Sequence, residues 1–184
     1  MWKIKRKLKR LLFRLRADFT TEQLEKRGLR VGKNFLRMHG TIIDPSHCWL
    51  ITIGDNVILA PRVHILAHDA STCHHLGYAR IGCVDIGDNV FIGASSVILP
   101  GVKIGNNSII GANSTVSKNI PDNVVAAGSP AKIVCTLDEY ISKNKTKMEE
   151  GRVYGEDYTL RGNITTNKKI QQRNELSQGD GFVL

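Results

Sequence analysis

Apolar residues recur at every sixth position over a long central stretch, from Val84 to about Val134. The first position of each hexad is Ile or Val, the second is usually Gly, and the fifth is small or β-branched. A period of six is too short for a helix and a turn, and β-branched residues suit strands, so each hexad predicts one short strand and one corner. Gly, Asn and Asp at the corners tolerate the backbone conformations of sharp bends. Stacked in register, the first positions would form the core of an all-β solenoid: Ile86, Ile92, Ile98, Ile104, Ile110 and Val116.

The same period extends toward the N-terminus less regularly, and we expect the solenoid to occupy residues 29–134. Pro45 interrupts the pattern once and predicts a local protrusion, because proline cannot donate a hydrogen bond to a strand ladder. A longer polar stretch over residues 69–80 has no hexad register and predicts a loop inserted between two coils. Loops that project from a rigid scaffold often carry function, so this insertion is a candidate binding loop.

The N-terminal segment, residues 1–28, has a helical pattern instead. Residues 1–16 place their apolar side chains on one helical face, with basic residues around the rest. A second short helix is predicted for residues 18–27, capped by Thr20 or Thr21 and ended by Gly28. The apolar face of the first helix consists of Ile4, Leu8, Leu11, Leu12 and Leu15.

The C-terminal segment, residues 135–184, contains no hexads. A short charged helix is predicted from Leu137, and residues 151–184 are predicted to form a polar tail anchored by Tyr154, Tyr158 and Phe182. Because the end of a solenoid leaves a strand edge open, we expect this segment to cover that edge or to wrap a neighbouring subunit.

Most of the net charge of +9 is local, since residues 1–16 contribute +8 and leave +1 for the rest of the chain. A basic amphipathic helix can bind an anionic membrane surface, or it can pack its apolar face on a neighbouring coil or subunit. Both interpretations stay open at this point. The chain has no recognisable nucleic-acid-binding motif, so we expect no nucleic-acid partner.

The sequence also indicates a cellular compartment. There is no apolar stretch of the roughly 20 residues that a membrane span needs. Basic residues interrupt the N-terminal apolar positions, so no secretory signal is expected. The four cysteines lack C-x-x-C spacing and are expected to be reduced and to fill the core. We therefore expect a cytoplasmic protein, peripheral to the inner face of the membrane if the basic helix binds there.

The hexads resemble those of the hexapeptide-repeat acyltransferase family, and the resemblance covers roughly residues 29–134. It is closest to the maltose and galactoside O-acetyltransferase branch, and within it to the sugar O-acetyltransferases of bacterial surface-polysaccharide synthesis. The resemblance implies a left-handed parallel β-helix of triangular section and a homotrimer with active sites between subunits. It also implies acetyl-CoA as co-substrate and, as acceptor, a hydroxyl of a sugar or lipid-linked oligosaccharide used in capsule, exopolysaccharide or lipopolysaccharide synthesis.

His68 is the candidate catalytic residue. Acetyl transfer to a hydroxyl needs a base, and histidine titrates near neutral pH. Of the six histidines (His39, His47, His64, His68, His74 and His75), His68 ends the last regular hexad where the loop departs. The resemblance favours the same residue and implies direct transfer without an acyl-enzyme, with the oxyanion held by a backbone N–H at Gly93–Ala94.

The resemblance also implies the residues that bind coenzyme A. Small residues along the coil edge would admit the pantetheine arm, and lysines would meet its phosphates. Related enzymes often have Arg in place of Lys132 and a further basic residue in place of Cys135. The implied coenzyme contacts are Gly93, Ala94, Ala112, Ser117, Lys118 and Lys132.

For the acceptor, Asp44 and His47 are candidates because the coil before His68 lines the cleft in similar enzymes. Asp44 could instead orient His68 or cap the turn at Pro45. We expect no metal ion, because the related γ-class carbonic anhydrases need three histidines and Ala94 and Leu99 stand in place of two of them.

The same fold is compatible with three other functions. Serine acetyltransferase is disfavoured because the large N-terminal helical domain typical of those enzymes is missing. An N-acetyltransferase acting on an amino sugar or an antibiotic stays open. A non-catalytic scaffold subunit is disfavoured by His68 and by the intact coils at Gly93 and Ala112.

Overall fold

The computed structural model describes residues 19–184. The basic helix expected over residues 1–16 lies outside this part of the chain. The chain divides into two compact units, Met1–Leu137 and Asp138–Leu184. Each unit is described separately.

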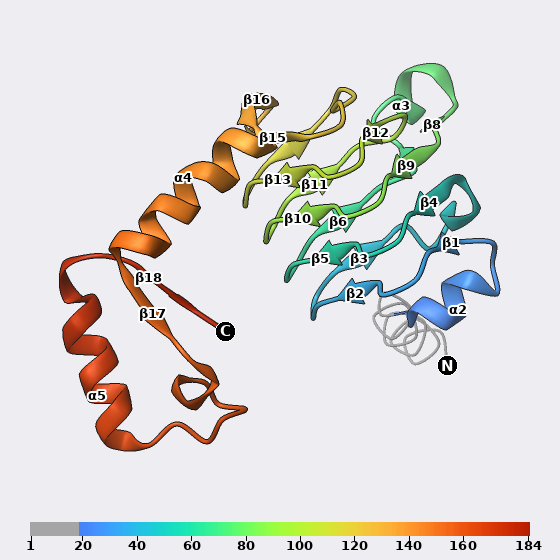
Figure 1. Ribbon diagram of the computed structural model, residues 1–184. Coiled ribbons are helices and arrows are strands. Elements are labelled where there is room, and N and C mark those ends of the chain that lie inside the picture. Colours follow the sequence, from blue (N-terminus) through green and yellow to red (C-terminus); the bar gives the residue numbers. More distant parts are fainter. Residues whose placement is uncertain (1–18) are drawn as a thin grey trace, which may run out of the picture. The chain divides into compact units, whose positions relative to one another are not determined.

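The first unit is built from three sheets of very short strands, which the chain visits in rotation (Figure 1). The first sheet contains β1 (Arg30–Val31), β4 (Ile51–Ile53), β9 (Val84–Ile86) and β12 (Lys103–Ile104). The second contains β2 (Leu36–Arg37), β5 (Ile58–Leu59), β10 (Phe91–Ile92), β13 (Ile109–Ile110), β15 (Val124–Gly128) and β16 (Ala131–Thr136). The third contains β3 (Ile42–Ile43), β6 (His64–Ile65), β11 (Val97–Ile98) and β14 (Thr115–Val116).

Three successive strands, one in each sheet, make one coil. Strands of neighbouring coils pair in parallel and in register, as Ile92 does with Leu59 and Ile110. The exception is the antiparallel pair β15–β16, which ends the second sheet. This is the arrangement predicted from the hexads, and the predicted β-helix is confirmed.

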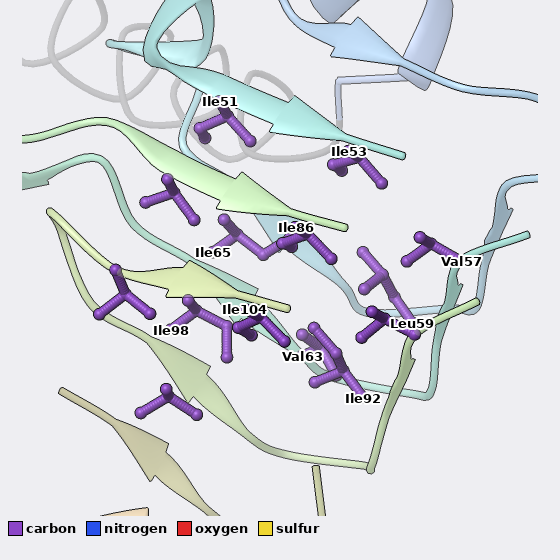
Figure 2. Close-up of a cluster of buried hydrophobic side chains, with 14 of the residues drawn as sticks. Ile51, Ile53, Val57, Leu59, Val63, Ile65, Ile86, Ile92, Ile98 and Ile104 are labelled. Carbon is purple, nitrogen blue, oxygen red and sulfur yellow. The ribbon is translucent and has the colours of Figure 1, made fainter. Parts of the chain in front are cut away.

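The buried aliphatic side chains point into the interior and stack on their equivalents in the coils above and below (Figure 2). Strand β2 is an exception, because Arg37 pairs with the buried Leu59 and Leu36 is exposed. Because the interior of the solenoid is narrow, one or two aliphatic residues from most strands fill it, and these side chains are removed from water. The six residues predicted to form the core are all buried: Ile86, Ile92, Ile98, Ile104, Ile110 and Val116.

The corner between the first and second sheets shows why asparagine recurs in the hexads. Five stacked asparagines have positive φ angles between 53° and 59°, a region that asparagine tolerates better than most residues. Each side-chain amide also donates to the amide oxygen of the next, at 2.9–3.0 Å. The ladder consists of Asn34, Asn56, Asn89, Asn107 and Asn123.

The corner between the third and first sheets carries two excursions in successive coils. The first follows Pro45 and contains the one-turn helix η1 (Cys48–Leu50), where the sequence predicts a protrusion. The second contains β7 (His68–Asp69), α3 (Cys73–Leu76) and β8 (Arg80–Ile81), with β7 and β8 paired antiparallel. The insertion over residues 69–80 is therefore a hairpin with a short helix rather than an irregular loop.

The helix predicted for residues 18–27 is shorter in the structure. It is α2 (Thr21–Glu25), and Thr20 caps it through a reciprocal pair of hydrogen bonds with Gln23. Its Leu24 is fully buried in the core of the first unit. Gly28, at φ +103°, turns the chain into the first coil as predicted.

The second unit corrects the prediction of a plain polar tail. After α4 (Leu137–Glu150) come β17 (Arg152–Tyr154), η2 (Glu156–Tyr158), α5 (Thr166–Glu175), η3 (Leu176–Gln178) and β18 (Gly181–Val183). Strands β17 and β18 pair in parallel. Tyr154 is buried, donates to Glu175 at 2.8 Å and contacts the ring of Tyr158 at 4.8 Å. Of the two tyrosines predicted as anchors, Tyr154 is thus buried in a small folded unit, and Tyr158 packs against it while partly exposed.

The prediction that cysteines fill the core is right for Cys48 alone, which is fully buried. Cys73 and Cys135 are partly exposed, Cys83 is exposed, and all four are free thiols. Among residues 19–184, none of the helices has the length and apolar character needed to cross a bilayer.

Candidate active site

His68 and Asp44 face each other across two successive coils. Asp44 directly follows β3, and His68 lies three residues after β6, which pairs with β3. The backbone N–H of Asp44 donates to the backbone oxygen of Ile65 at 2.9 Å and holds these two segments of the chain side by side. Nδ1 of His68 forms a hydrogen bond with Oδ2 of Asp44. The Asp44 side chain is 0% exposed and the His68 side chain 34% exposed, so the imidazole alone reaches solvent.

The environment of Asp44 keeps its carboxylate ionised. Burial by itself raises the pKa of the Asp44 carboxyl, but hydrogen bonds from His68, Ser46 and Ala67 outweigh burial and hold that pKa below the ordinary 3.8. The backbone N–H groups of Ser46 and Ala67 lie 2.9 Å and 3.1 Å from the carboxylate oxygens. Near neutral pH, Asp44 is therefore a buried anion held by three donors.

The buried anion decides which nitrogen of His68 is the base. A carboxylate accepts hydrogen bonds and cannot donate them, so Nδ1 of His68 carries the proton between the two groups. In the neutral imidazole, Nε2 then has the free lone pair. The pair thus has the geometry of a carboxylate-oriented general base.

His47 and Trp49 continue the same cluster from the first excursion. The ring centroid of His47 lies 5.0 Å from that of His68 and 5.1 Å from that of Trp49. Nδ1 of His47 is buried without a hydrogen-bond partner in the described part of the chain. The structure therefore brings together His68, Asp44 and His47, and it adds Trp49. Sequence reasoning passed over Trp49, although an aromatic residue two positions from a candidate histidine was a signal for it.

The cluster has the composition of a metal site, since one donor atom from each of Asp44, His47 and His68 lies within 4.8 Å of the others. Two ligands of one tetrahedral zinc ion, each about 2.0 Å from it, stand roughly 3.3 Å apart with the ion between them. Here Nδ1 of His68 is hydrogen-bonded directly to the Asp44 carboxylate, and because an ionised carboxylate can only accept, the proton belongs to Nδ1. The arrangement as it stands suits proton transfer rather than metal binding.

The predicted coenzyme contacts divide between two corners. Gly93, Ala94 and Ala112 stack at the corner between the second and third sheets, where Asn113 donates to Ala94 at 2.8 Å. A Cβ added to Gly93 would lie 2.8 Å from Cα of Ala112, so this close stacking requires glycine. Ala112 is exposed and Ala94 partly exposed.

The remaining predicted contacts lie elsewhere on the solenoid. Ser117 and Lys118 follow β14, at the corner that also carries His68, and both are exposed. Lys132 is exposed on β16, opposite Ala127 of β15. Within one chain the third sheet thus separates the corner of Ala94 from the corner of His68. The structure does not join the predicted base and the predicted oxyanion donor in a single pocket of one chain.

The other histidines lie apart from this cluster in the described chain. His39 is exposed, and His64 is half-buried within β6. His74 and His75 are exposed in the last turn of α3.

Comparison with known proteins identifies the family. The model for bacterial transferase hexapeptide (six repeats) matches residues 84–118. Protein CapG of Staphylococcus aureus is 36% identical over 178 residues, which are 93% of this chain and 98% of that protein. A maltose O-acetyltransferase from Clostridium difficile 630 has a TM-score of 0.55 and 31% identity, over 70% of this chain and 83% of that one.

A second solved structure, a galactoside acetyltransferase in complex with coenzyme A, has a TM-score of 0.55 and 30% identity, over 73% of this chain and 80% of that one. The predicted left-handed β-helix and the predicted family are confirmed by these matches. Since the maltose O-acetyltransferase is 31% identical and is covered over 83% of its length, the protein belongs to the hexapeptide-repeat acetyltransferase family, in its galactoside and maltose O-acetyltransferase-like branch.

Proposed function

We propose that this acetyltransferase moves an acetyl group from acetyl-CoA to a sugar hydroxyl during the synthesis of a surface polysaccharide such as a capsule. The hydrogen-bonded pair of Asp44 and His68 carries the proposal, because a partly exposed imidazole with its outer nitrogen free suits deprotonation of a hydroxyl. The similarity to galactoside and maltose acetyltransferases supports a sugar acceptor.

The reaction is a direct transfer. Nε2 of His68 takes the proton of the acceptor hydroxyl while its oxygen attacks the carbonyl carbon of the thioester. Asp44 remains ionised and stabilises the imidazolium that forms. The tetrahedral oxyanion accepts a hydrogen bond from a backbone N–H at Gly93–Ala94, a donor worth about 3 kcal/mol. Collapse of the intermediate breaks the carbon–sulfur bond, and the departing thiolate takes the proton from His68.

The separation of the two corners supports a composite site. If the base and the oxyanion donor of one chain lie on opposite sides of the third sheet, the two act together when His68 of one subunit faces Ala94 of another. A homotrimer with its active sites between subunits satisfies this requirement. Pantetheine would then lie along the small residues at Ala94 and Ala112, with Ser117, Lys118 and Lys132 near the phosphates.

The experiment that tests this function combines binding with turnover. Acetyl-CoA at 100 times its dissociation constant should raise the free energy of unfolding by about 2.7 kcal/mol, seen as a higher melting temperature. Addition of a pyranoside such as methyl β-D-galactoside or maltose should then release thiol from acetyl-CoA. Acetyl phosphate, which lacks the coenzyme, serves as the control ligand and should give no such shift.

If acetyl-CoA does not stabilise the protein and no thiol is released, the proposal is contradicted and a non-catalytic subunit is favoured. Thiol release with amino sugars alone, and N-acetylated products, would instead identify an N-acetyltransferase.

We further propose that the N-terminal segment brings the enzyme to the cytoplasmic face of an anionic membrane, where lipid-linked acceptors are found. Each basic residue near such a surface contributes about 1 kcal/mol, and residues 1–16 contain eight of them. Deletion of residues 2–16 should therefore abolish co-sedimentation with vesicles that contain phosphatidylglycerol. Vesicles of phosphatidylcholine are the control. Equal binding by the full chain and the deletion variant would assign the segment to packing within the protein instead.

A further inference from the structure

Trp49 combines a fixed backbone with an exposed ring. It lies in η1 between Cys48, which is fully buried, and β4, whose first residue Ile51 is also fully buried. Sγ of Cys48 lies 3.6 Å from the backbone oxygen of Leu24, and a Cβ added to Gly28 would lie 2.8 Å from Cβ of Trp49. The backbone around Trp49 is thus held on both sides. Trp49 as a residue is nevertheless 49% exposed.

A row of rings leads from this exposed indole to the catalytic base. His47 lies between Trp49 and His68, with ring-centroid distances of 5.1 Å and 5.0 Å and tilts of 48° and 41°. The indole therefore stands two ring contacts from His68. A group resting on Trp49 would lie within reach of the base if it were the size of a short saccharide.

We propose that Trp49 is the platform on which a pyranose ring of the acceptor stacks, with His47 setting its distance from His68. The C–H face of a pyranose is apolar, and a rigid indole offers it a large surface at small entropic cost. This inference rests on the proposed function and adds a binding subsite to it. The subsite selects cyclic sugars over open-chain alcohols, because only a ring presents a flat apolar face.

The composition of the chain allows a direct measurement of contact with Trp49. The sequence contains two tryptophans, Trp2 and Trp49, so Trp2→Phe leaves Trp49 as the single indole fluorophore. In the full-length Trp2→Phe protein with bound coenzyme A, titration with methyl β-D-galactoside and with maltose should change the emission in a saturable way. Sorbitol, an open-chain polyol, should leave the emission unchanged.

Kinetics give the second measurement. Trp49→Ala should raise KM for the pyranosides about tenfold at saturating acetyl-CoA, which corresponds to about 1.4 kcal/mol of lost stacking. Trp49→Phe keeps an aromatic face and should retain most of the wild-type KM. KM for sorbitol should be the same in the wild type and in Trp49→Ala. As a matched control outside the first unit, Tyr140→Ala removes an exposed ring from α4 and should leave KM for the pyranosides unchanged.

The outcomes separate this inference from the proposed function. Suppose that the wild type acetylates pyranosides, that pyranosides leave the Trp49 emission unchanged, and that KM is the same in Trp49→Ala. The stacking subsite is then overturned, and the proposed function stands. An equal loss of affinity for sorbitol and for pyranosides would also overturn it, since that pattern indicates general damage to the site. If no pyranoside is acetylated by the wild type, the proposed function fails and the subsite fails with it.

Discussion

Replacement of His68 by alanine should lower turnover by about 10²- to 10⁴-fold, the range for a lost general base. The imidazole is partly exposed while its partner carboxylate is fully buried, so Asp44 cannot act as the base in its place. The measurement is thiol release from acetyl-CoA at saturating pyranoside. The increase of the melting temperature with acetyl-CoA should remain close to that of the wild type, while the melting temperature itself should fall, because buried Asp44 loses one of its three donors.

The control is His64→Ala, which removes a half-buried histidine from β6 one hexad earlier and should retain wild-type turnover. Asp44→Asn should also lower turnover, because it removes the anion that orients His68. In the double variant the loss should be no larger than that of His68→Ala alone, since Asp44 acts through His68. A fully active His68→Ala protein would rule out the proposed mechanism.

Mixed trimers of two inactive variants should regain about one third of wild-type turnover, because a ring of three subunits places one intact site in every mixed trimer. One variant, His68→Ala, lacks the base, and the other, Ala94→Trp, fills the corner where pantetheine and the oxyanion donor are proposed to meet. In the proposed composite site, His68 of one subunit works with Ala94 of its neighbour. Whichever variant supplies two of the three subunits, one interface joins an intact His68 to an intact Ala94.

The measurement uses co-expressed chains with different affinity tags, purified on both tags in turn and assayed for thiol release. Each variant assembled alone is the control and should be nearly inactive. A mixed trimer no more active than these controls, with light scattering showing three chains, would place the base and the oxyanion donor in the same subunit. A monomer or dimer in light scattering would contradict the trimer itself.

The local sequence pattern was sufficient to predict the solenoid. Each hexad carries its own strand residue and its own corner residue, so Ile98 indicates a buried position and Asn107 a left-handed bend without reference to distant parts of the chain. His68 was recognisable for a similar reason, because it stands where the regular period ends. These features depend on neighbours within a few positions, and the sequence records such neighbours directly.

The side-chain contacts between coils could not be predicted from the sequence. Asp44 and His68 are 24 positions apart, and their meeting depends on the parallel register of β3 and β6 and on two excursions that leave from the same corner. From residue types alone, Asp44 could bind the acceptor, orient His68 or cap the turn at Pro45. In the structure its carboxylate bonds to His68 and also to the backbone of Ser46 in that turn.

The sequence by itself determined the fold, the family and the identity of the candidate base, because a short period repeats the same local rule in every coil. Only the tertiary structure decided how the site is assembled. It joined Asp44, His47 and Trp49 to His68, separated His68 from Ala94 by the width of a sheet, and folded residues 151–184 around Tyr154 through the pairing of β17 with β18. The physical reason is that strand register and the lengths of the excursions set which distant side chains meet, and neither is specified by any single hexad.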